Sequence, residues 1–582
     1  MVIQTHTGNL PADGAALPDL AVLSRLANEL FTALPGSTRQ APGLNSQHAS
    51  GRAPALADQA ASENVVHGGH AVQSGEAGNI ARTVTERPYY FLDETGARRQ
   101  PVPADLNVND ENLVIAQSFG LPGGDNLNAL VRSLTAESPA PAALPVLSNE
   151  YYFFETTSPG PFGQRDREIE GRSIGAFDVE AVRRDFPLLS ERVNGRPLIW
   201  LDNAATTQKP QAVIDRLAYF YAHENSNIHR AAHELAARAT DAYEAARSKV
   251  ARFLGAKSEN EIIFVRGATE AINLVAQTFG RKYIREGDEI IVSLLEHHAN
   301  IVPWQQLAAE VGAKIRVIPV DETGQVKLDE YQKLLNAKTR LVAITQVSNA
   351  LGTITPVQEI IALAHRAGAR VLVDGAQAVS HLRVDVQALD ADFYVFSGHK
   401  VFAPTGIGIV YGKSELLDLL PPWQGGGNMI ADVTFEKTAY QDAPARFEAG
   451  TGNIADAVGL GAALDYLERI GFDAASRYEH DLLGYATKGL LSVPGLRLIG
   501  TAREKASVLS FVLNRYRTEE VGAALNREGI AVRSGHHCAQ PILRRFGLEA
   551  TVRPSLSFYN TCDEVDALVS VLRQLAAGRK VY

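Results

Sequence analysis

The sequence predicts an α/β protein built around a large, mainly parallel β-sheet. Six short apolar runs bounded by turn residues lie between residues 261 and 398, and such runs are typical of strands buried on both faces. The runs are "EIIFV", "DEIIVSLL", "AKIRVIPV", "TRLVAITQ", "ARVLVDG" and "ADFYVFSG". Helical patterns such as "TEAINLVAQTFGRKYI" and "VQEIIALAHRAG" separate many of them. This alternation favours helices on both faces of the sheet and ligands at the carboxyl ends of its strands.

We expect the 582 residues to form three parts, and composition changes at the first boundary, near residue 176. Residues 1–176 are rich in Ala, Gly, Pro, Ser and Asn, and the first lysine of the chain is Lys209. Such a segment buries too little apolar surface to offset chain entropy, so we predict that it is mostly disordered. Residues 177–459 are expected to form the large domain. Residues 460–582 are expected to form a small α+β domain, against which residues 177–196 pack.

Apolar islands interrupt the N-terminal segment. "LPDLAVLSRLANELFTAL" has leucines at helical spacing and predicts a short amphipathic helix, and "NLNALVRSL" predicts a weaker one. "RPYYFLDE" and "NEYYFFET" are near copies of one aromatic motif. Exposed aromatic side chains are typical binding anchors, so a docking role is favoured over a linker with an accidental repeat.

Charge and cysteine content exclude several classes of protein. The net charge is -10, with a pI of about 5.9, so there is no basic excess for nucleic acid. No apolar run is long enough to span a membrane, and the N-terminus lacks the pattern of a signal peptide. Two cysteines build no disulfide framework, and scarce thiols fit a reducing cytoplasm. We therefore predict a cytoplasmic protein that binds neither nucleic acid nor membrane.

Two predicted strands end in residues that suit pyridoxal 5'-phosphate (PLP). "DFYVFSGHK" ends in Lys400, and a lysine in a half-buried cleft can form a Schiff base. "RVLVDGAQ" ends in Asp374, a carboxylate placed to pair with a protonated pyridine nitrogen, and Gln377 could donate to the ring oxygen. The alternatives are a surface lysine and an aspartate that caps the next helix.

A phosphate site and a stacking residue are also predicted. "FVRGATEAINLVA" places Thr269 at a helix N-terminus after a glycine turn, which is an anion site, and Ser397 and His399 could add donors. "LLEHHAN" places His297 after a strand, where it could stack on a ring and move protons. The alternative is an ordinary buried histidine.

"AVRSGHHCAQP" raises the question of a metal site or a nucleophile. A closed zinc site wants four ligands, and the chain has no C-x-x-C pair, so we predict no metal. A thiolate at Cys538 beside His537 and near Arg533 is better supported, because positive neighbours lower the pKa of a thiol. Cys562 is interpreted as structural. Arg553, before an alternating strand, could bind a substrate carboxylate in bidentate fashion.

Together these motifs resemble the PLP-dependent cysteine desulfurases of fold type I, specifically the Suf-type group II enzymes of the class V aminotransferase family. The resemblance runs from about Phe177 to the C-terminus, and "RSGHHC" is the element typical of a desulfurase or the related selenocysteine lyase. It also rests on "LDNAATTQKP", "FVRGATEAINLVA", "EHHANIVPW", "VSNALGT", "VLVDGAQAV", "DFYVFSGHK", "PTGIGI" and "RFEAGT". It implies conversion of L-cysteine to L-alanine, with the sulfur left as a persulfide on Cys538.

The resemblance assigns roles residue by residue. Lys400 is the Schiff-base lysine and the base, Asp374 and Gln377 contact the ring, and His297 stacks on it as an acid/base. Thr269, Ser397 and His399 hold the phosphate, and Thr451 reaches the phosphate of a neighbouring subunit, which implies a homodimer. Asn349, Arg553 and Arg533 bind the substrate, and Cys538 passes sulfur to an acceptor protein.

Two departures from the family pattern stand out. "GTGN" stands where members often read "GTPN", and the family does not normally carry a 176-residue extension. The extension resembles the cargo-loading segments of cysteine desulfurases packaged in encapsulin nanocompartments, where repeated anchors would gain avidity against a symmetric shell. The alternative is an extension that docks a different sulfur-acceptor partner.

Overall fold

The structure is a computed structural model that describes residues 177–229 and 233–579. The predicted disorder, the two short helices and the two aromatic motifs of residues 1–176 lie outside the described residues. Within the described ranges, no helix is long and apolar enough to cross a membrane.

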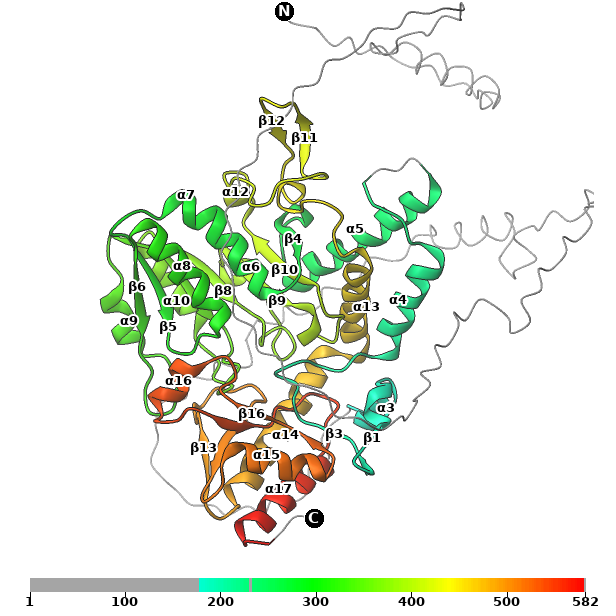
Figure 1. Cartoon of the computed structure of the whole chain (residues 1–582), viewed down its shortest axis with the longest axis vertical. Coiled ribbons are helices and arrows are strands. Elements are labelled where there is room, and N and C mark those ends of the chain that lie inside the picture. Colours follow the sequence, from blue (N-terminus) through cyan, green and yellow to red (C-terminus); the bar gives the residue numbers. More distant parts are fainter. Residues whose placement is uncertain (1–176, 230–232, 580–582) are drawn as a thin grey trace, which may run out of the picture. The chain divides into compact units, whose positions relative to one another are not determined.

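A seven-stranded sheet forms the centre of the larger part of the fold (Figure 1), with the order β4-β10-β9-β8-β7-β5-β6. Strands β9, β8, β7, β5 and β6 pair in parallel, whereas β10 runs antiparallel to both β4 and β9. The strands are β4 (Ile262–Val265), β5 (Glu289–Ser293), β6 (Lys314–Ile318), β7 (Thr339–Thr345), β8 (Arg370–Asp374), β9 (Phe393–Ser397) and β10 (Gly408–Gly412). The six predicted runs therefore all form strands, and the predicted mainly parallel sheet is confirmed.

Helices cover both faces of this sheet, because side chains alternate between the faces along each buried strand. Ile263 and Val265 of β4 belong to a core with α6 and α8, whereas Ile262 and Phe264 belong to a core with α5, α10 and α13. The helices of this part are α4 (Gln211–His223), α5 (Glu234–Leu254), α6 (Ala268–Val275), α7 (Arg281–Tyr283), α8 (Val302–Val311), α9 (Leu328–Leu334), α10 (Val357–Arg366), α11 (Val386–Leu389), α12 (Ser414–Leu417) and α13 (Ile454–Ile470).

The predicted helix over residues 269–284 is interrupted. Helix α6 passes into a π-helical segment, η4 (Ala276–Gly280), before α7 begins at Arg281. A side chain at Gly280 would place its Cβ 2.4 Å from Leu307 Cδ2, so glycine lets α8 approach this segment closely. Helical spacing in the sequence alone does not reveal such a widened turn.

The C-terminal part is an antiparallel sheet of four strands with four helices, shown in orange and red in Figure 1. Its strands are β13 (Leu496–Ile499), β14 (Ser510–Leu513), β16 (Arg533–Gly535) and β17 (Thr551–Arg553), and its helices are α14 (Phe472–Leu491), α15 (Thr518–Arg527), α16 (Gln540–Arg545) and α17 (Cys562–Ala576). This matches the predicted small α+β part. The division at residue 460 stays a prediction, and it lies within α13.

The first described residues contact the C-terminal part. They form α3 (Val179–Arg184), the 3-10 turn η2 (Pro187–Ser190) and the short strands β1 (Arg192–Val193), β2 (Arg196–Pro197) and β3 (Ile199–Trp200). Arg183 pairs with Glu564 at 2.9 Å, the ring of Phe177 lies 5.3 Å from that of Tyr478, and β3 pairs in parallel with β15 (Ile530–Ala531).

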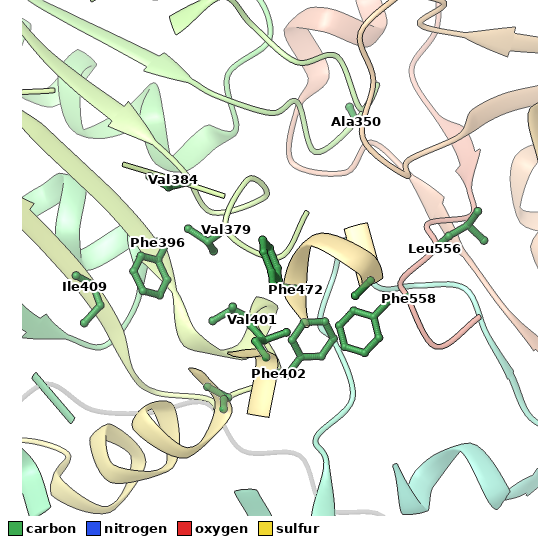
Figure 2. Close-up of a cluster of buried hydrophobic side chains, with 14 of the residues drawn as sticks. Ala350, Val379, Val384, Phe396, Val401, Phe402, Ile409, Phe472, Leu556 and Phe558 are labelled. Atoms are coloured by element: carbon green, nitrogen blue, oxygen red, sulfur yellow. The ribbon is translucent and has the colours of Figure 1, made fainter. Parts of the chain in front are cut away.

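One apolar core joins the large sheet to the C-terminal part. Figure 2 shows Phe402, two residues after Lys400, against Phe558, and their ring centres are 4.6 Å apart. Both residues are buried, together with Val401 and Phe472. The segment that follows Lys400 is thereby packed against the part of the chain that carries Cys538.

A hairpin of β11 (Ile430–Val433) and β12 (Thr438–Tyr440) completes the described strands. Phe435 in its turn is fully exposed.

Candidate active site

A cavity of about 680 Å³ lies at the carboxyl ends of the large sheet. Its wall includes eleven of the twelve predicted site residues: Thr269, His297, Asn349, Asp374, Gln377, Ser397, His399, Lys400, Arg533, Cys538 and Arg553. Thr451 is not on this wall; it is exposed, with its Oγ1 3.3 Å from Asn227 Oδ1. A role for Thr451 at a neighbouring subunit stays a prediction.

Lys400 and Asp374 come from neighbouring parallel strands. Asp374 is the last residue of β8, and Lys400 lies in the short 3-10 turn η6 (Gly398–Lys400) that follows β9. Burial lowers the pKa of Lys400 to about 8, although the charge of Asp374 acts in the opposite direction. An amine with this pKa is available in its neutral, nucleophilic form near neutral pH.

Asp374 is a buried carboxylate that accepts a hydrogen bond from the N–H of Ala376 at 2.9 Å. Burial raises its pKa, and the hydrogen bond and the charge of Lys400 oppose the rise. A cationic ring nitrogen in the cavity would stabilise the ionised form of Asp374, which Ala376 and Lys400 do only in part. The Asp374 carboxylate is thus an acceptor that fits the pyridinium N–H of PLP.

Gln377 and His297 lie on the same wall. Gln377 Nε2 donates to the carbonyl of Ala204 at 2.6 Å, and His297 Nδ1 accepts from the N–H of Ala299 at 3.0 Å. Burial, with a further effect from Lys400, lowers the pKa of His297 to about 3. The ring is therefore neutral at neutral pH with its proton on Nε2, and a flat neutral ring of this kind suits stacking.

The predicted phosphate residues converge at the start of α6. Ser397 Oγ accepts from the N–H of Ala268 at 2.9 Å, and Thr269 lies beside it on the cavity wall. A Cβ at Gly408 would lie 2.4 Å from Gly267 Cα, so glycine at position 408 lets β10 approach the loop before α6. Helix N-terminal N–H groups and hydroxyls are the donors that phosphate requires, so the cradle fits that group.

Residues 202–209 are a part of the site that the sequence interpretation missed. Thr207 N and Thr206 Oγ1 donate to the carbonyl of His399 at 3.1 and 3.0 Å, and Lys209 Nζ donates to the same carbonyl at 3.1 Å. Burial lowers the pKa of Lys209 to about 8. The segment "LDNAATTQK" therefore fixes the peptide next to Lys400. The sequence signal that could have identified this segment is its run of polar residues directly after the apolar residues of β3.

Glu296 is a buried residue directly before His297, and no role was predicted for it. Its carboxyl group is buried and accepts hydrogen bonds from Ser293 Oγ at 2.5 Å, Asn300 Nδ2 at 2.6 Å and the N–H of Thr345 at 3.1 Å. Burial raises its pKa to about 8. The group ties the end of β5 to the end of β7 directly beside His297.

The loop that carries Cys538 has an unusual backbone. His537 and Cys538 have φ values of 53° and 52°, in the left-handed region that side chains disfavour. Three hydrogen bonds hold this shape: Cys538 N to His536 Nδ1 at 3.0 Å, His298 N to Cys538 O at 2.8 Å, and Asn349 Nδ2 to His537 O at 2.7 Å. The large sheet therefore positions the thiol-bearing loop through residues that follow β5 and β7.

The interpretation of His537 as a positive neighbour of the thiol is wrong. Its ring is buried, with Nε2 2.8 Å from Thr551 Oγ1, and burial lowers its pKa to about 3. The cationic side chains that share the cavity wall with Cys538 are Lys400, Arg533 and Arg553. Cys562 lies apart, as the first residue of α17, where burial and then Asp566 and Asp563 raise the pKa of its thiol.

Arg553 and Asn349 supply polar atoms without partners. Arg553 is 2% exposed, donates from Nη1 to the carbonyl of Asn349 at 3.0 Å and pairs through Nη2 with Asp202 at 3.2 Å. Arg553 Nε and Asn349 Oδ1 are buried and find no hydrogen-bond partner among residues 177–229 and 233–579. Orphaned buried polar atoms are costly, so a ligand that offers both an acceptor and a donor fits this wall. An amino acid with its carboxylate at Arg553 is such a ligand.

The family model of the class-V aminotransferases matches residues 199–568. The chain belongs to the class-V aminotransferase family. PLP is the cofactor of this family, and the cradle at α6, Asp374 and Lys400 fit it.

Relatives of this class-V aminotransferase are cysteine desulfurases. The chain is 71% identical over 408 residues to the "Cysteine desulfurase" of Synechococcus elongatus, covering 70% of this chain and 65% of that protein. It is 60% identical over 443 residues to a "Probable cysteine desulfurase" of Mycolicibacterium paratuberculosis, covering 76% of this chain and 64% of that protein. The chain thus spans slightly less than two thirds of these two relatives.

A crystal structure of the cysteine desulfurase CsdA (S-sulfonic acid) from Escherichia coli is similar to this fold. It superimposes with a TM-score of 0.65 at 41% identity, covering 69% of this chain and 99% of the bacterial chain. This similarity supports the fold-type I architecture that the motifs implied.

Proposed function

We propose that this class-V aminotransferase is a cysteine desulfurase of the Suf-type group II kind, which converts L-cysteine to L-alanine and leaves the sulfur on Cys538 as a persulfide. The observation that carries the proposal is that one cavity wall holds Lys400, Asp374 and the Cys538 thiol. Relatives named as cysteine desulfurases support the same reaction.

PLP, when bound, supplies an electron sink for the pair released at the substrate Cα. Lys400 is the base for the Cα proton, because burial lowers the pKa of its amine to about 8. Asp374 stabilises positive charge at the ring nitrogen, and Arg553 holds the substrate carboxylate. The neutral Nε2–H of His297 donates a hydrogen bond toward the reacting atoms.

Cys538 is the sulfur acceptor in this proposal. Its thiolate attacks the substrate sulfur, so an S–S bond forms while the substrate Cβ–S bond breaks. The electron pair of the broken bond stays with the carbon skeleton, which takes up protons and leaves as L-alanine. Lys400 and Arg553 lie on the same cavity wall as the attacking sulfur.

Replacing each cysteine in turn tests this role. Cys538→Ser should abolish the persulfide and reduce alanine release from L-cysteine to background, because serine offers no sulfur to form the S–S bond. Cys562→Ser is the matched control and should keep both signals, since Cys562 lies in α17 outside the cavity. The readouts are alanine release and persulfide labelling with peptide mass spectrometry. Alanine release at the normal rate from Cys538→Ser, or a persulfide on Cys562, would overturn the assignment.

The partners remain part of the proposal. We infer a homodimer with Thr451 at the neighbouring cavity, a sulfur-acceptor protein, and an encapsulin shell protein that binds residues 1–176. Capture of a shell protein by residues 1–176 alone, with alanine release retained after their deletion, supports the loading role. Loss of turnover on deletion contradicts it. Equal or faster alanine release from L-selenocysteine would favour the alternative, a selenocysteine lyase.

A further inference from the structure

Asp202 is a buried carboxylate that holds two arginines of the cavity from behind its wall. It follows β3, and its backbone bridges to Ser555. Its Oδ2 accepts from Nε and Nη2 of Arg533 at 3.1 and 3.0 Å, and its Oδ1 accepts from Nη2 of Arg553 at 3.2 Å. Both arginines line the cavity, whereas Asp202 is not among the lining residues.

Arg533, Arg553 and Asp202 together carry one net positive charge. Two guanidinium groups share one carboxylate, which leaves one positive charge uncompensated. Arg553 is 2% exposed, so its charge is poorly screened by solvent. One ligand carboxylate at Arg553 compensates this charge, and the negative charge of Asp202 opposes a second anionic group on the ligand.

We propose that Asp202 is a positioning residue that sets the substrate class of this site, by restricting it to amino acids with a single carboxylate. It does so by orienting Arg553 and by neutralising one of the two arginines. This inference rests on the proposed function, because it concerns the amino acid that the same cavity binds.

The test compares how the PLP-loaded chain binds L-alanine and L-aspartate. Binding is followed by titrating the cofactor absorbance, which requires no turnover. In Asp202→Asn the ratio of the L-alanine Kd to the L-aspartate Kd should rise about tenfold or more, because loss of one negative charge a few ångströms away favours the dianion. The amide keeps an oxygen for Arg553 while the charge is removed.

A second variant should shift the ratio of the two Kd values in the opposite direction. In Arg533→Gln, Asp202 keeps its charge and loses one of its two cations, so the same ratio should fall. Arg533 is half exposed, with 52% of its side chain accessible, so this variant keeps the test available if Asp202→Asn does not fold. A ratio that does not rise in Asp202→Asn, or does not fall in Arg533→Gln, overturns the proposal.

Asp392→Asn is the matched control. Asp392 is a buried carboxylate paired with Arg370 at 3.0 Å at the opposite edge of the sheet. Its loss should lower stability and leave the ratio unchanged; a ratio that shifts as in Asp202→Asn would show that general loosening, not Asp202, sets selectivity. Alanine release from L-cysteine by the wild-type chain tests the proposed function separately, so the two failures are distinguishable.

Discussion

The two edges of the seven-stranded sheet differ in which form of their titratable groups is favoured: the neutral form at the carboxyl edge and the charged form at the amino edge. At the carboxyl edge, burial raises the pKa values of Asp374 and Glu296 and lowers those of Lys400, His297 and His399. Every one of these shifts favours the neutral form. Groups whose neutral form is favoured by burial destabilise the folded chain, and they are available for acid–base and nucleophilic chemistry.

The amino edge instead pairs its charges. His365 lies between Asp390 and Asp392 at 3.0 and 2.7 Å, and Arg370 bonds the same Asp392 at 3.0 Å. Hydrogen bonding to Asp392 raises the pKa of His365, and Lys413 and His365 hold the pKa of Asp390 below its usual value despite partial burial. These shifts favour the charged forms. The same strands therefore carry ion pairs at one end and, at the other, buried titratable groups whose neutral forms are favoured.

The largest expected effect is at the carboxyl edge. Lys400→Ala should lower alanine release from L-cysteine by about a thousandfold or more, because the chain loses its general base and its Schiff-base amine. It should also remove the absorbance band of the lysine-bound cofactor. Turnover assays and absorbance spectra of the purified chain measure both effects.

Lys505→Met is the matched control for that change. Burial also lowers the pKa of Lys505 to about 8, but its Nζ donates to the carbonyls of Leu351 and Gly500 outside the cavity. The band should persist in this variant. Its loss there would mean that a lowered lysine pKa, rather than position in the cavity, marks the functional amine.

A histidine at each edge should give opposite pH dependences. For His297 the folded pKa is about 3, below the ordinary 6.5, so the unfolded chain binds a proton first as pH falls. This residue therefore destabilises the fold progressively below about pH 6.5, by about 1.4 kcal/mol per pH unit. In the cofactor-free chain, His297→Gln should gain stability relative to wild type between pH 6 and pH 4. Urea unfolding across this range measures the difference, and a constant difference would contradict a buried neutral ring.

The sequence predicts the parallel strands and the residues at their ends better than it predicts the loop that carries Cys538. The apolar runs predicted every parallel strand, and Lys400, Asp374 and His297 could be placed because each lies at the end of one or within four residues after it. Parallel strands present their carboxyl ends at one edge, so neighbours in the sheet become neighbours in the site.

The arrangement around Cys538 could not be derived in the same way. The loop depends on two consecutive residues with positive φ and on a hydrogen bond from His298, which lies 240 positions earlier in the chain. Asp202 contacts arginines 331 and 351 residues away. No local pattern encodes such contacts. The error over His537 has the same origin, because its burial against Thr551 decides its charge.

The smallest expected effect concerns the amino edge and completes the comparison. The folded pKa of His365 is raised, so its stabilising charge is fully present below about pH 6.5 and is lost as pH rises through the folded value. His365→Gln should therefore be less stable than wild type by about 1 kcal/mol at pH 5.5, with the difference shrinking above the folded pKa. Urea unfolding at pH 5.5 and pH 9 measures it, and added salt should reduce it at the lower pH. A deficit of the same size at both pH values would show that His365 contributes packing rather than charge, and that the two edges do not differ in the way their titratable groups suggest.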